Sequence, residues 1–296
     1  MCNVAITIFV VTSNKFGIGT IVKLNMKLEE STFSPIEDLV KEGDLNRAVE
    51  SYPSLLAANP GHPAAHHNFA MLLRKLGRTE EAIEQSKIAY ELSPNNPTII
   101  FSFGISQEQG GFLTEAEWYY RESLTLRPFY TAALNNLGRL LDQMERPMEA
   151  VPLLERAHQV APDDRHVSLN LANACISLGR PTDAEKYIKE PQSAAALNTL
   201  GIARYVQRDW VSAEDLFQRA VYADPDFPGA HENLALVLLH IGKFEEGWSE
   251  YNWRWKNSAN NLTNRIFGKP LWDGTHLGGK SLLLHSEQGF GDTIQF

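Results

Sequence analysis

Apolar, small and polar positions recur along the middle of the chain with a period of 34 residues. Prolines mark this period most clearly, because those at positions 60, 94, 128 and 162 are each separated by 34 residues. The next proline in phase is Pro225, which lies 63 residues after Pro162 and so indicates one repeat of normal length and one that is five residues shorter. A fixed period of this length is typical of stacked supersecondary units.

Each period contains two helix-like stretches, which we call helix A and helix B. Helix B carries an alanine twelve positions before the proline, at Ala48, Ala82, Ala116, Ala150 and Ala213. Four positions later stands a large residue, at Tyr52, Tyr120, Leu154 and Phe217, with Ser86 as the exception. Helix A carries a large residue followed by a small one, at Phe69-Ala70, Phe103-Gly104, Leu137-Gly138, Leu171-Ala172, Leu200-Gly201 and Leu234-Ala235. The pattern predicts antiparallel helix pairs in which the small residue of helix A lies against the alanine of helix B.

Glycines and prolines at fixed positions complete the repeat pattern. We expect the turn between the two helices at Gly43, Gly77, Gly111, Gly179 and Gly242, and we expect the proline to end helix B. Together these features resemble the tetratricopeptide repeat family. The resemblance covers residues 32–257 and implies an all-α, right-handed solenoid of about seven helix-turn-helix units, at 32–62, 63–96, 97–130, 131–164, 165–193, 194–227 and 228–257. The unit 165–193 is short and contains Pro191, which predicts a kink or hinge nearby.

Asparagines recur on helix A just before the large–small dipeptide. They occupy four of six units, at Asn68, Asn136, Asn170 and Asn233, with Ser102 and Thr199 in the other two. A carboxamide has one acceptor and two donors, so a column of them can bond an extended backbone whatever its side chains. The column is similar to that of O-linked N-acetylglucosamine transferases, which implies a peptide-binding groove of Asn68, Asn136, Asn170 and Asn233, flanked by Asn135 and Arg139. The alternative is that these asparagines bond only neighbouring helices or water.

Cations in the predicted groove raise a second possibility. Chaperone adaptors of the carboxylate-clamp class place Lys and Arg on helix A, and the candidates here are Arg74, Lys75 and Arg139. The chain has 27 Lys and Arg against 36 Asp and Glu, a formal charge of -9, which disfavours both this class and nucleic-acid binding. The predicted partner is therefore a peptide or protein segment, and whether the chain associates with itself stays open.

Composition also bears on the compartment. The longest apolar run is Val4 to Val11, too short for the roughly 20 residues of a membrane-spanning helix. No basic segment precedes it as in a secretory signal, and two cysteines, Cys2 and Cys175, form no disulfide framework, which favours a cytoplasmic protein with no membrane association. Residues 1–31 are interpreted as an N-terminal extension, with the hypothesis that translation starts at Met26. His66 and His67 are sequence neighbours that do not share a helix face, so we expect no metal site.

The last forty residues have a different character. Residues 258–279 are interpreted as a linker, and Lys280 to His285 predict a buried strand that a glycine-rich turn follows. Gly274 to Ser281 match the phosphate-binding loop motif GxxxxGK[ST]. That loop follows a buried strand and opens a helix, whereas here a turn precedes the motif and a predicted strand follows it, so we do not expect a nucleotide-binding loop. Residues 248–296 resemble the entrance to a two-Rossmann-domain (GT-B type) glycosyltransferase region. The resemblance implies that 280–296 start an incomplete α/β domain.

That resemblance also suggests catalytic residues. It implies Asp292 as a candidate general base and Gly289 and Gly291 as places where backbone approaches a nucleotide sugar, the cofactor expected of a longer parent protein. The alternative for Asp292 is a helix N-cap. One strand and a turn cannot close a cleft, so we expect the chain itself to be inactive, to hold no cofactor and to act as the acceptor-recognition part of a glycosyltransferase. The competing interpretation is a free-standing repeat adaptor without enzymatic activity.

Overall fold

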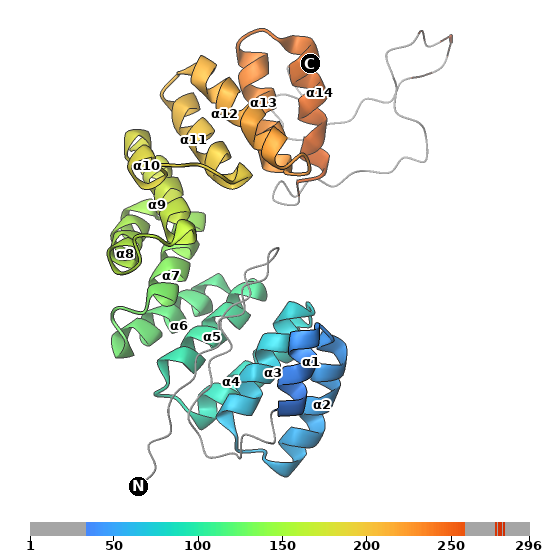
Figure 1. Cartoon of the computed structure of the whole chain (residues 1–296), viewed down its shortest axis with the longest axis vertical. Coiled ribbons are helices and arrows are strands. Elements are labelled where there is room, and N and C mark those ends of the chain that lie inside the picture. The colour runs from blue at the N-terminus through green and yellow to red at the C-terminus, as the bar shows by residue number, and fades with distance from the viewer. Residues whose placement is uncertain (1–33, 258–275, 277, 280, 282–296) are drawn as a thin grey trace. The chain divides into compact units, whose positions relative to one another are not determined.

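The computed structural model of the chain describes residues 34–257, 276, 278–279 and 281. Within these residues every regular element is helical, as the repeat pattern predicts, and the helices are labelled in Figure 1. They are α1 (Ser34–Glu42), α2 (Leu45–Ala58), α3 (Pro63–Lys75), α4 (Thr79–Leu92), α5 (Pro97–Gln109), α6 (Leu113–Leu126), α7 (Thr131–Gln143), α8 (Pro147–Val160), α9 (Arg165–Ser177), α10 (Pro181–Tyr187), α11 (Ala194–Val206), α12 (Trp210–Ala223), α13 (Pro228–His240), α14 (Phe244–Tyr251) and the 3-10 helix η2 (Asn252–Trp255). The strand and glycine turn predicted for 280–296 lie outside the described residues, Ser281 apart.

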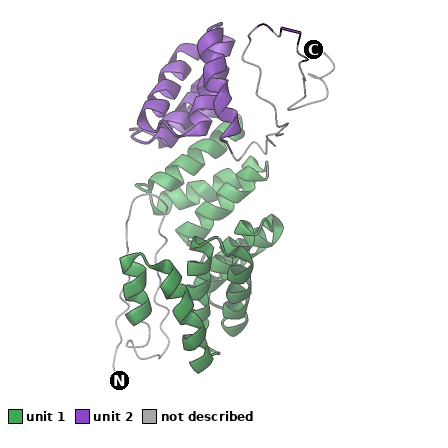
Figure 2. Cartoon of the chain, turned by 90° about the vertical axis from the view of Figure 1, so that its right-hand side faces the viewer, with its two compact units in different colours: residues 1–179 green, residues 180–296 purple. Residues whose placement is uncertain are grey.

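The chain divides into two compact units, residues 1–179 and 180–296 (Figure 2). The first contains α1 to α9 and the second contains α10 to α14. Helices A and B of one repeat pack on each other, as α5 does on α6 and α11 on α12, and each B helix then packs on the next A helix of its unit. Pro191 lies in the non-helical segment between α10, which already ends at Tyr187, and α11, so the second helix of this repeat is short, and a kink or hinge near Pro191 stays a prediction.

The turns between helices A and B confirm the predicted role of the glycines. Gly43, Gly77, Gly111, Gly179 and Gly242 all have left-handed backbone, with φ between 73° and 85°. Two repeats lack this glycine, and Glu145 and Arg208 adopt the same conformation there, with φ of 59° and 63°. The repeat geometry therefore imposes the left-handed turn even on residues that disfavour it.

The prolines also stand where predicted. Pro60, Pro94, Pro128, Pro162 and Pro225 each lie two residues beyond the last residue of a B helix. Proline has no amide hydrogen to continue the helical ladder, so the chain leaves the helix and turns into the next repeat.

The contact between helices A and B involves the large residue of helix B. The alanines of helix B are completely buried, as expected. A Cβ added to Gly104, Gly138 or Gly201 of helix A, however, would meet Tyr120 at 2.7 Å, Leu154 at 2.4 Å or Phe217 at 2.5 Å. In these three repeats the large side chain four residues after the alanine is therefore the nearest neighbour over the glycine, and contact between the small residue and the alanine itself stays a prediction.

None of the helices in the described ranges is both long enough and apolar enough to cross a membrane.

Candidate peptide-binding surface

The predicted asparagines lie on the A helices, and the structure joins two of them to carboxamides of the preceding A helix. Nδ2 of Asn170 on α9 donates to Oδ1 of Asn135 on α7 at 2.9 Å. In the second compact unit, Nδ2 of Asn233 on α13 donates to Oδ1 of Asn198 on α11, also at 2.9 Å. Asn170 and Asn233 therefore each bond a neighbouring A helix, and whether their remaining polar groups also bind a peptide stays a prediction.

Asn198 was not among the predicted residues, although a sequence signal for it exists. Both carboxamide pairs join residues that are 35 positions apart. This spacing is one repeat of 34 plus one residue, so each pair connects the predicted column to the position just before it in the previous repeat. Searching for a second asparagine 35 residues upstream would have found Asn198.

Each pair leaves hydrogen-bonding capacity unused. The bond takes one donor of Asn170 and the acceptor of Asn135, and in the described part of the chain neither the Asn135 amide hydrogens nor the Asn170 oxygen has another partner. Asn135 and Asn170 are both partly exposed, whereas Asn198 is 8% exposed. The pair on α7 and α9 therefore holds its amide groups in a fixed orientation while they remain open to a ligand.

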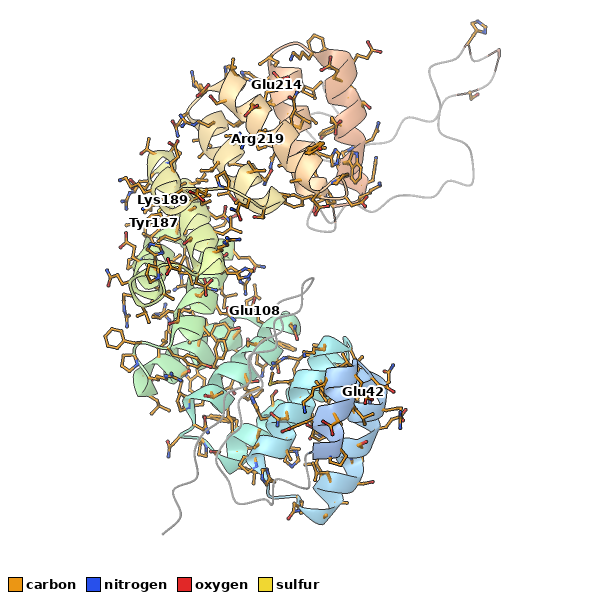
Figure 3. The ribbon with its side chains drawn as sticks, viewed as in Figure 1. Glu42, Glu108, Tyr187, Lys189, Glu214 and Arg219 are labelled. Atoms are coloured by element: carbon orange, nitrogen blue, oxygen red, sulfur yellow. The ribbon has the colours of Figure 1, made fainter. Side chains whose placement is uncertain are left out.

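Asn136 and Arg139, the other predicted residues on α7, belong to a polar network with α5 and α6. Tyr120 donates from its hydroxyl to Oε2 of Glu108 at 2.7 Å, and Arg139 forms an ion pair with the other oxygen of Glu108, a residue labelled in Figure 3. Asn136 bonds the same tyrosine side chain. Burial, reinforced by the charge of Glu108, raises the pKa of Tyr120 far above its ordinary value, so the phenol stays protonated as a donor.

Arg74 on α3, one of the clamp candidates, is satisfied by hydroxyl and carbonyl groups of α5. Its Nη1 donates to the carbonyl and the Oγ of Ser102, both at 2.8 Å, and to Oγ of Ser106 at 3.1 Å. The hydroxyl oxygens of Ser86 on α4 and Ser106 are 2.7 Å apart and form a hydrogen bond. This bond explains why a serine replaces the large residue of that repeat. Burial lowers the pKa of Arg74 to about 10, and among the described residues no carboxylate forms an ion pair with it.

With Arg139 held by Glu108 and Arg74 held by serines, Lys75 is the one clamp candidate whose side chain projects, exposed, from the end of α3. Arg74 and Lys75 form no ion pair in the described residues, but the guanidinium of Arg74 is bonded to serine groups of α5, so the three candidates do not present their charges together. The geometry therefore favours carboxamide recognition over a carboxylate clamp.

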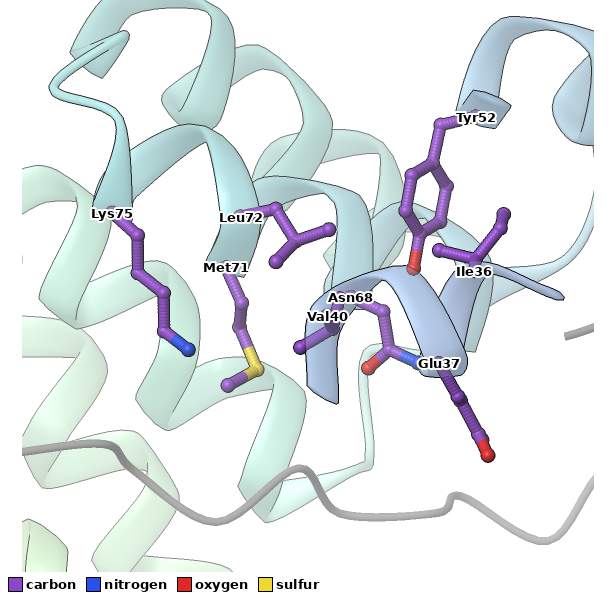
Figure 4. Close-up of a pocket in the computed structure, with 8 residues that line it drawn as sticks. All are labelled: Ile36, Glu37, Val40, Tyr52, Asn68, Met71, Leu72 and Lys75. Carbon is purple, nitrogen blue, oxygen red and sulfur yellow. The ribbon is translucent and has the colours of Figure 1, made fainter. Parts of the chain in front are cut away.

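Asn68, the first residue of the predicted column, stands apart from the others. It lies on α3 beside a pocket that α1 closes on one side (Figure 4). Its Oδ1 is buried without a hydrogen-bond partner in the described residues. The predicted catalytic residue Asp292 and the predicted cofactor-binding Gly289 and Gly291 lie outside the described residues.

Paired helices in register, left-handed A–B turns and polar side chains aligned on successive A helices define an α-helical repeat scaffold, a class that presents extended surfaces to binding partners. Two sequence-family models, both described as tetratricopeptide repeat, match the chain, one at residues 39–85 and 143–200 and the other at 186–228 and 198–252. Together they cover more than half of the chain, which belongs to the tetratricopeptide repeat proteins.

Curated relatives are similar at low identity. Protein FlbA of Caulobacter vibrioides is 26% identical over 234 residues, which are 65% of this chain and 39% of FlbA. The human protein O-mannosyl-transferase TMTC3 is 25% identical over 179 residues, which are 55% of this chain and 19% of TMTC3. The chain thus spans between about a fifth and two fifths of the length of these relatives.

Solved structures show the same fold. A tetratricopeptide repeat protein from Parabacteroides merdae superposes with a TM-score of 0.66 at 18% identity, covering 80% of this chain and 94% of that one. YrrB, whose structure is described as a tetratricopeptide repeat protein with an unusual peptide-binding site, superposes with a TM-score of 0.50 at 21% identity, covering 62% of this chain and 96% of YrrB.

Proposed function

We propose that this chain binds an extended segment of a partner protein along the faces of its A helices. The observation that supports this most strongly is the carboxamide pair formed by Asn135 and Asn170. Asparagine is mildly unfavourable inside a helix, and here two of them meet across neighbouring A helices with amide donors and an acceptor left over. Such groups match the N–H and C=O of a peptide backbone and do not depend on its side chains.

In a longer parent protein, the bound segment would be the acceptor of a glycosyltransferase. Two observations support this extension: the resemblance of residues 248–296 to a glycosyltransferase entrance, and the similarity to TMTC3, which is named as a protein O-mannosyl-transferase. In this proposal a nucleotide sugar is the donor, Asp292 acts as the base, and Gly289 and Gly291 let the backbone approach the donor. The alternative function, an adaptor without enzymatic activity, is favoured by the described residues themselves, which are helical repeats throughout 34–257.

Peptide binding is tested by selecting ligands from a random twelve-residue peptide library and measuring their affinity for variants. Asn135→Ala with Asn170→Ala should weaken binding by about 1–3 kcal/mol, the range expected when a buried hydrogen-bonding partner is lost. Gln109→Ala is the matched control, because this carboxamide is exposed at the end of α5 and makes no hydrogen bond in the described residues. Unchanged affinity in the double variant, with its helical circular dichroism intact, would exclude carboxamide recognition.

The glycosyltransferase extension is tested by the intact mass of the protein from its native source. A mass near the 33.2 kDa of this chain would support the adaptor. A mass of about 60–75 kDa, which allows roughly 150 residues for each of two further domains, would support the transferase.

A further inference from the structure

The helix α14, labelled in Figure 1, is the last B helix of the described residues and carries exposed aromatic side chains. Phe244 is 62% exposed and Trp248 is 58% exposed. They stand four positions apart, so they share one face of the helix. Tyr251 follows on the next turn and packs edge-on against Trp248, with ring centroids 5.7 Å apart. We call these three residues the aromatic face of α14.

Trp248 occupies a position of the repeat that is covered in every earlier repeat. It comes directly after the small residue of helix B, which is Gly247 in α14. Six earlier repeats carry another residue at this position: Val49, Ile83, Glu117, Val151, Glu185 and Glu214. None of these six is exposed, whereas Trp248 is.

Contacts with the following repeat supply much of this cover. The three glutamates form ion pairs with it: Glu117 with Arg146 at 2.6 Å, Glu185 with Arg204 at 3.0 Å and Glu214 with Lys243 at 2.6 Å. Ile83 lies at the end of the next A helix, where its Cδ1 would be 2.7 Å from a Cβ added to Gly110. In the described residues no repeat follows α14, so the surface around Trp248 lacks this cover.

The chemistry of α14 does not suit a solvent-facing end of the solenoid. A solenoid that ends in water carries a capping repeat with a polar outer face, whereas α14 has a tryptophan where three earlier repeats have glutamate. The 3-10 helix η2 packs beside α14 but covers a different surface, because its Trp253 stacks on His231 of α13 with ring centroids 3.8 Å apart. We therefore expect a further stretch of polypeptide to cover the aromatic face.

The chain that follows η2 is placed to supply this cover. The three glutamates find their partners 19 or 29 positions later in the sequence. The positions from 19 to 29 after Trp248 are residues 267–277, which contain Phe267, Leu271 and Trp272. Phe267 comes twelve residues after the end of η2, and twelve extended residues span up to about 40 Å. The eight residues of α14 are only about 12 Å long, so the segment can reach the whole aromatic face.

Charge separates this segment from a second copy of the chain as the occupant. Glu245 and Glu246 lie on the first turn of α14, are exposed and form no ion pair among the described residues. Arg265 and Lys269, in or next to the segment, carry the opposite charge. A second copy docked through the same face would instead bring its own two glutamates. Charge complementarity therefore favours the following segment over self-association.

We propose that residues 265–277 dock on the aromatic face of α14. The apolar side chains of this segment cover Phe244 and Trp248, and its two basic side chains lie near Glu245 and Glu246. Part of the predicted linker is then fixed to the last repeat, so whatever follows the linker is held in a defined orientation to the repeats. The inference goes beyond the proposed function and does not use the asparagine pair on which that function rests.

Photo-cross-linking in the full chain tests the docking. p-Benzoylphenylalanine, which bonds to C–H groups in contact with it, replaces Trp248 in one protein and Phe244 in another. On irradiation both proteins should form cross-links within the chain to residues 265–277, identified by peptide mass spectrometry, and dilution should leave the yield unchanged. Ser249 is the matched control position, because it is exposed and adjacent in sequence but is turned about 100° away from Trp248. The probe at this position should give little of the product.

Substitutions in the segment test whether its apolar side chains make the contact. In the protein that carries the probe at position 248, Leu271→Ser with Trp272→Ser should lower the cross-link yield about 10-fold, because two large apolar side chains no longer leave water on docking. Asn260→Ser with Asn261→Ser, in the same part of the chain, is the control and should leave the yield unchanged. Helical circular dichroism should be the same in all variants, since the substituted residues lie outside the described helices.

Absence of cross-links to residues 265–277 from both probe positions would overturn the proposal. An equal yield from the Ser249 position would also overturn it, because it would show a loose tether and not a docked segment. Cross-links that join two copies and decline on dilution would assign the face to a second copy instead. An unchanged yield in the Leu271→Ser, Trp272→Ser protein would exclude the apolar contact. The peptide-affinity measurements described above report separately on the proposed function, so either result can stand without the other.

Discussion

Gly138→Ala tests whether the close approach of helices A and B is what limits the repeat. Gly138 lies on α7 with ordinary helical backbone, so alanine should favour the helix by up to about 1 kcal/mol. The added Cβ, however, would lie 2.4 Å from Cγ, 2.9 Å from Cδ2 and 3.0 Å from Cδ1 of Leu154. Leu154 is completely buried, so overpacking should be unfavourable by about 1–3 kcal/mol.

With the full helix-propensity gain of about 1 kcal/mol subtracted from the packing term, the net destabilisation by Gly138→Ala is about 0–2 kcal/mol. The sign should reverse in a Leu154→Ala background. That substitution alone removes well-packed atoms and should be unfavourable by about 2–5 kcal/mol. It also removes the three atoms nearest to the new Cβ, so Gly138→Ala should then stabilise the protein by about 0.5–1 kcal/mol through helix propensity.

The assay has to be local, because repeat proteins open in segments and a single global transition is not assured. Hydrogen exchange of the α7 and α8 amides gives the free energy of local opening in each of the four proteins of the cycle. Gly61→Ala is the matched control, since a Cβ there would meet nothing within 4 Å. An equal effect of Gly138→Ala in both backgrounds would refute the packing argument.

Two further outcomes are expected. Glu145→Gly should stabilise the protein by about 0.5–1 kcal/mol, because Glu145 has a φ of 59° and the relief of left-handed strain by glycine exceeds the backbone entropy that glycine loses on folding. Thermal denaturation measures this change. No gain in stability would show that Glu145 is unstrained. Burial lowers the pKa of His67 to about 3, so this side chain stays neutral in the folded protein. In the unfolded chain it takes up a proton below about pH 6.5. Folding stability is therefore lost as the pH falls from about 6.5 towards 3. Wild type should therefore lose about 2 kcal/mol more than His67→Leu between pH 7.5 and 5 in chemical denaturation, with the exposed His166→Leu as control, and equal losses would contradict the assignment.

The repeat could be predicted from sequence because its signals are local. A left-handed turn favours glycine and a helix end tolerates proline, and both preferences act on single residues at a fixed period. This is why Gly77 and Gly111 identify turns without any knowledge of the packing. The same reasoning did not reveal Glu145 and Arg208, whose conformation the neighbouring helices impose.

The candidate surface could be predicted only in part. The asparagine column was visible in the sequence, but which partner each carboxamide takes depends on the residue that the adjacent A helix presents. Asn170 meets Asn135, Asn136 joins Tyr120, and Asn68 meets no amide. Ser86 is the exception among the large residues of helix B, and only the tertiary structure explains it, since Arg74 bonds Ser102 and Ser106 and Ser86 bonds Ser106.

The sequence by itself determined the helical repeat, its period and the places where helices begin and end, because these follow from the preferences of residues close together in the chain. Only the tertiary structure decided that the glycines of helix A accommodate Tyr120, Leu154 and Phe217, and that Asn68 faces an apolar pocket with no hydrogen-bond partner in the described chain. Such contacts join residues of different helices, and the distance and rotation between helices arise from the packing of whole side chains.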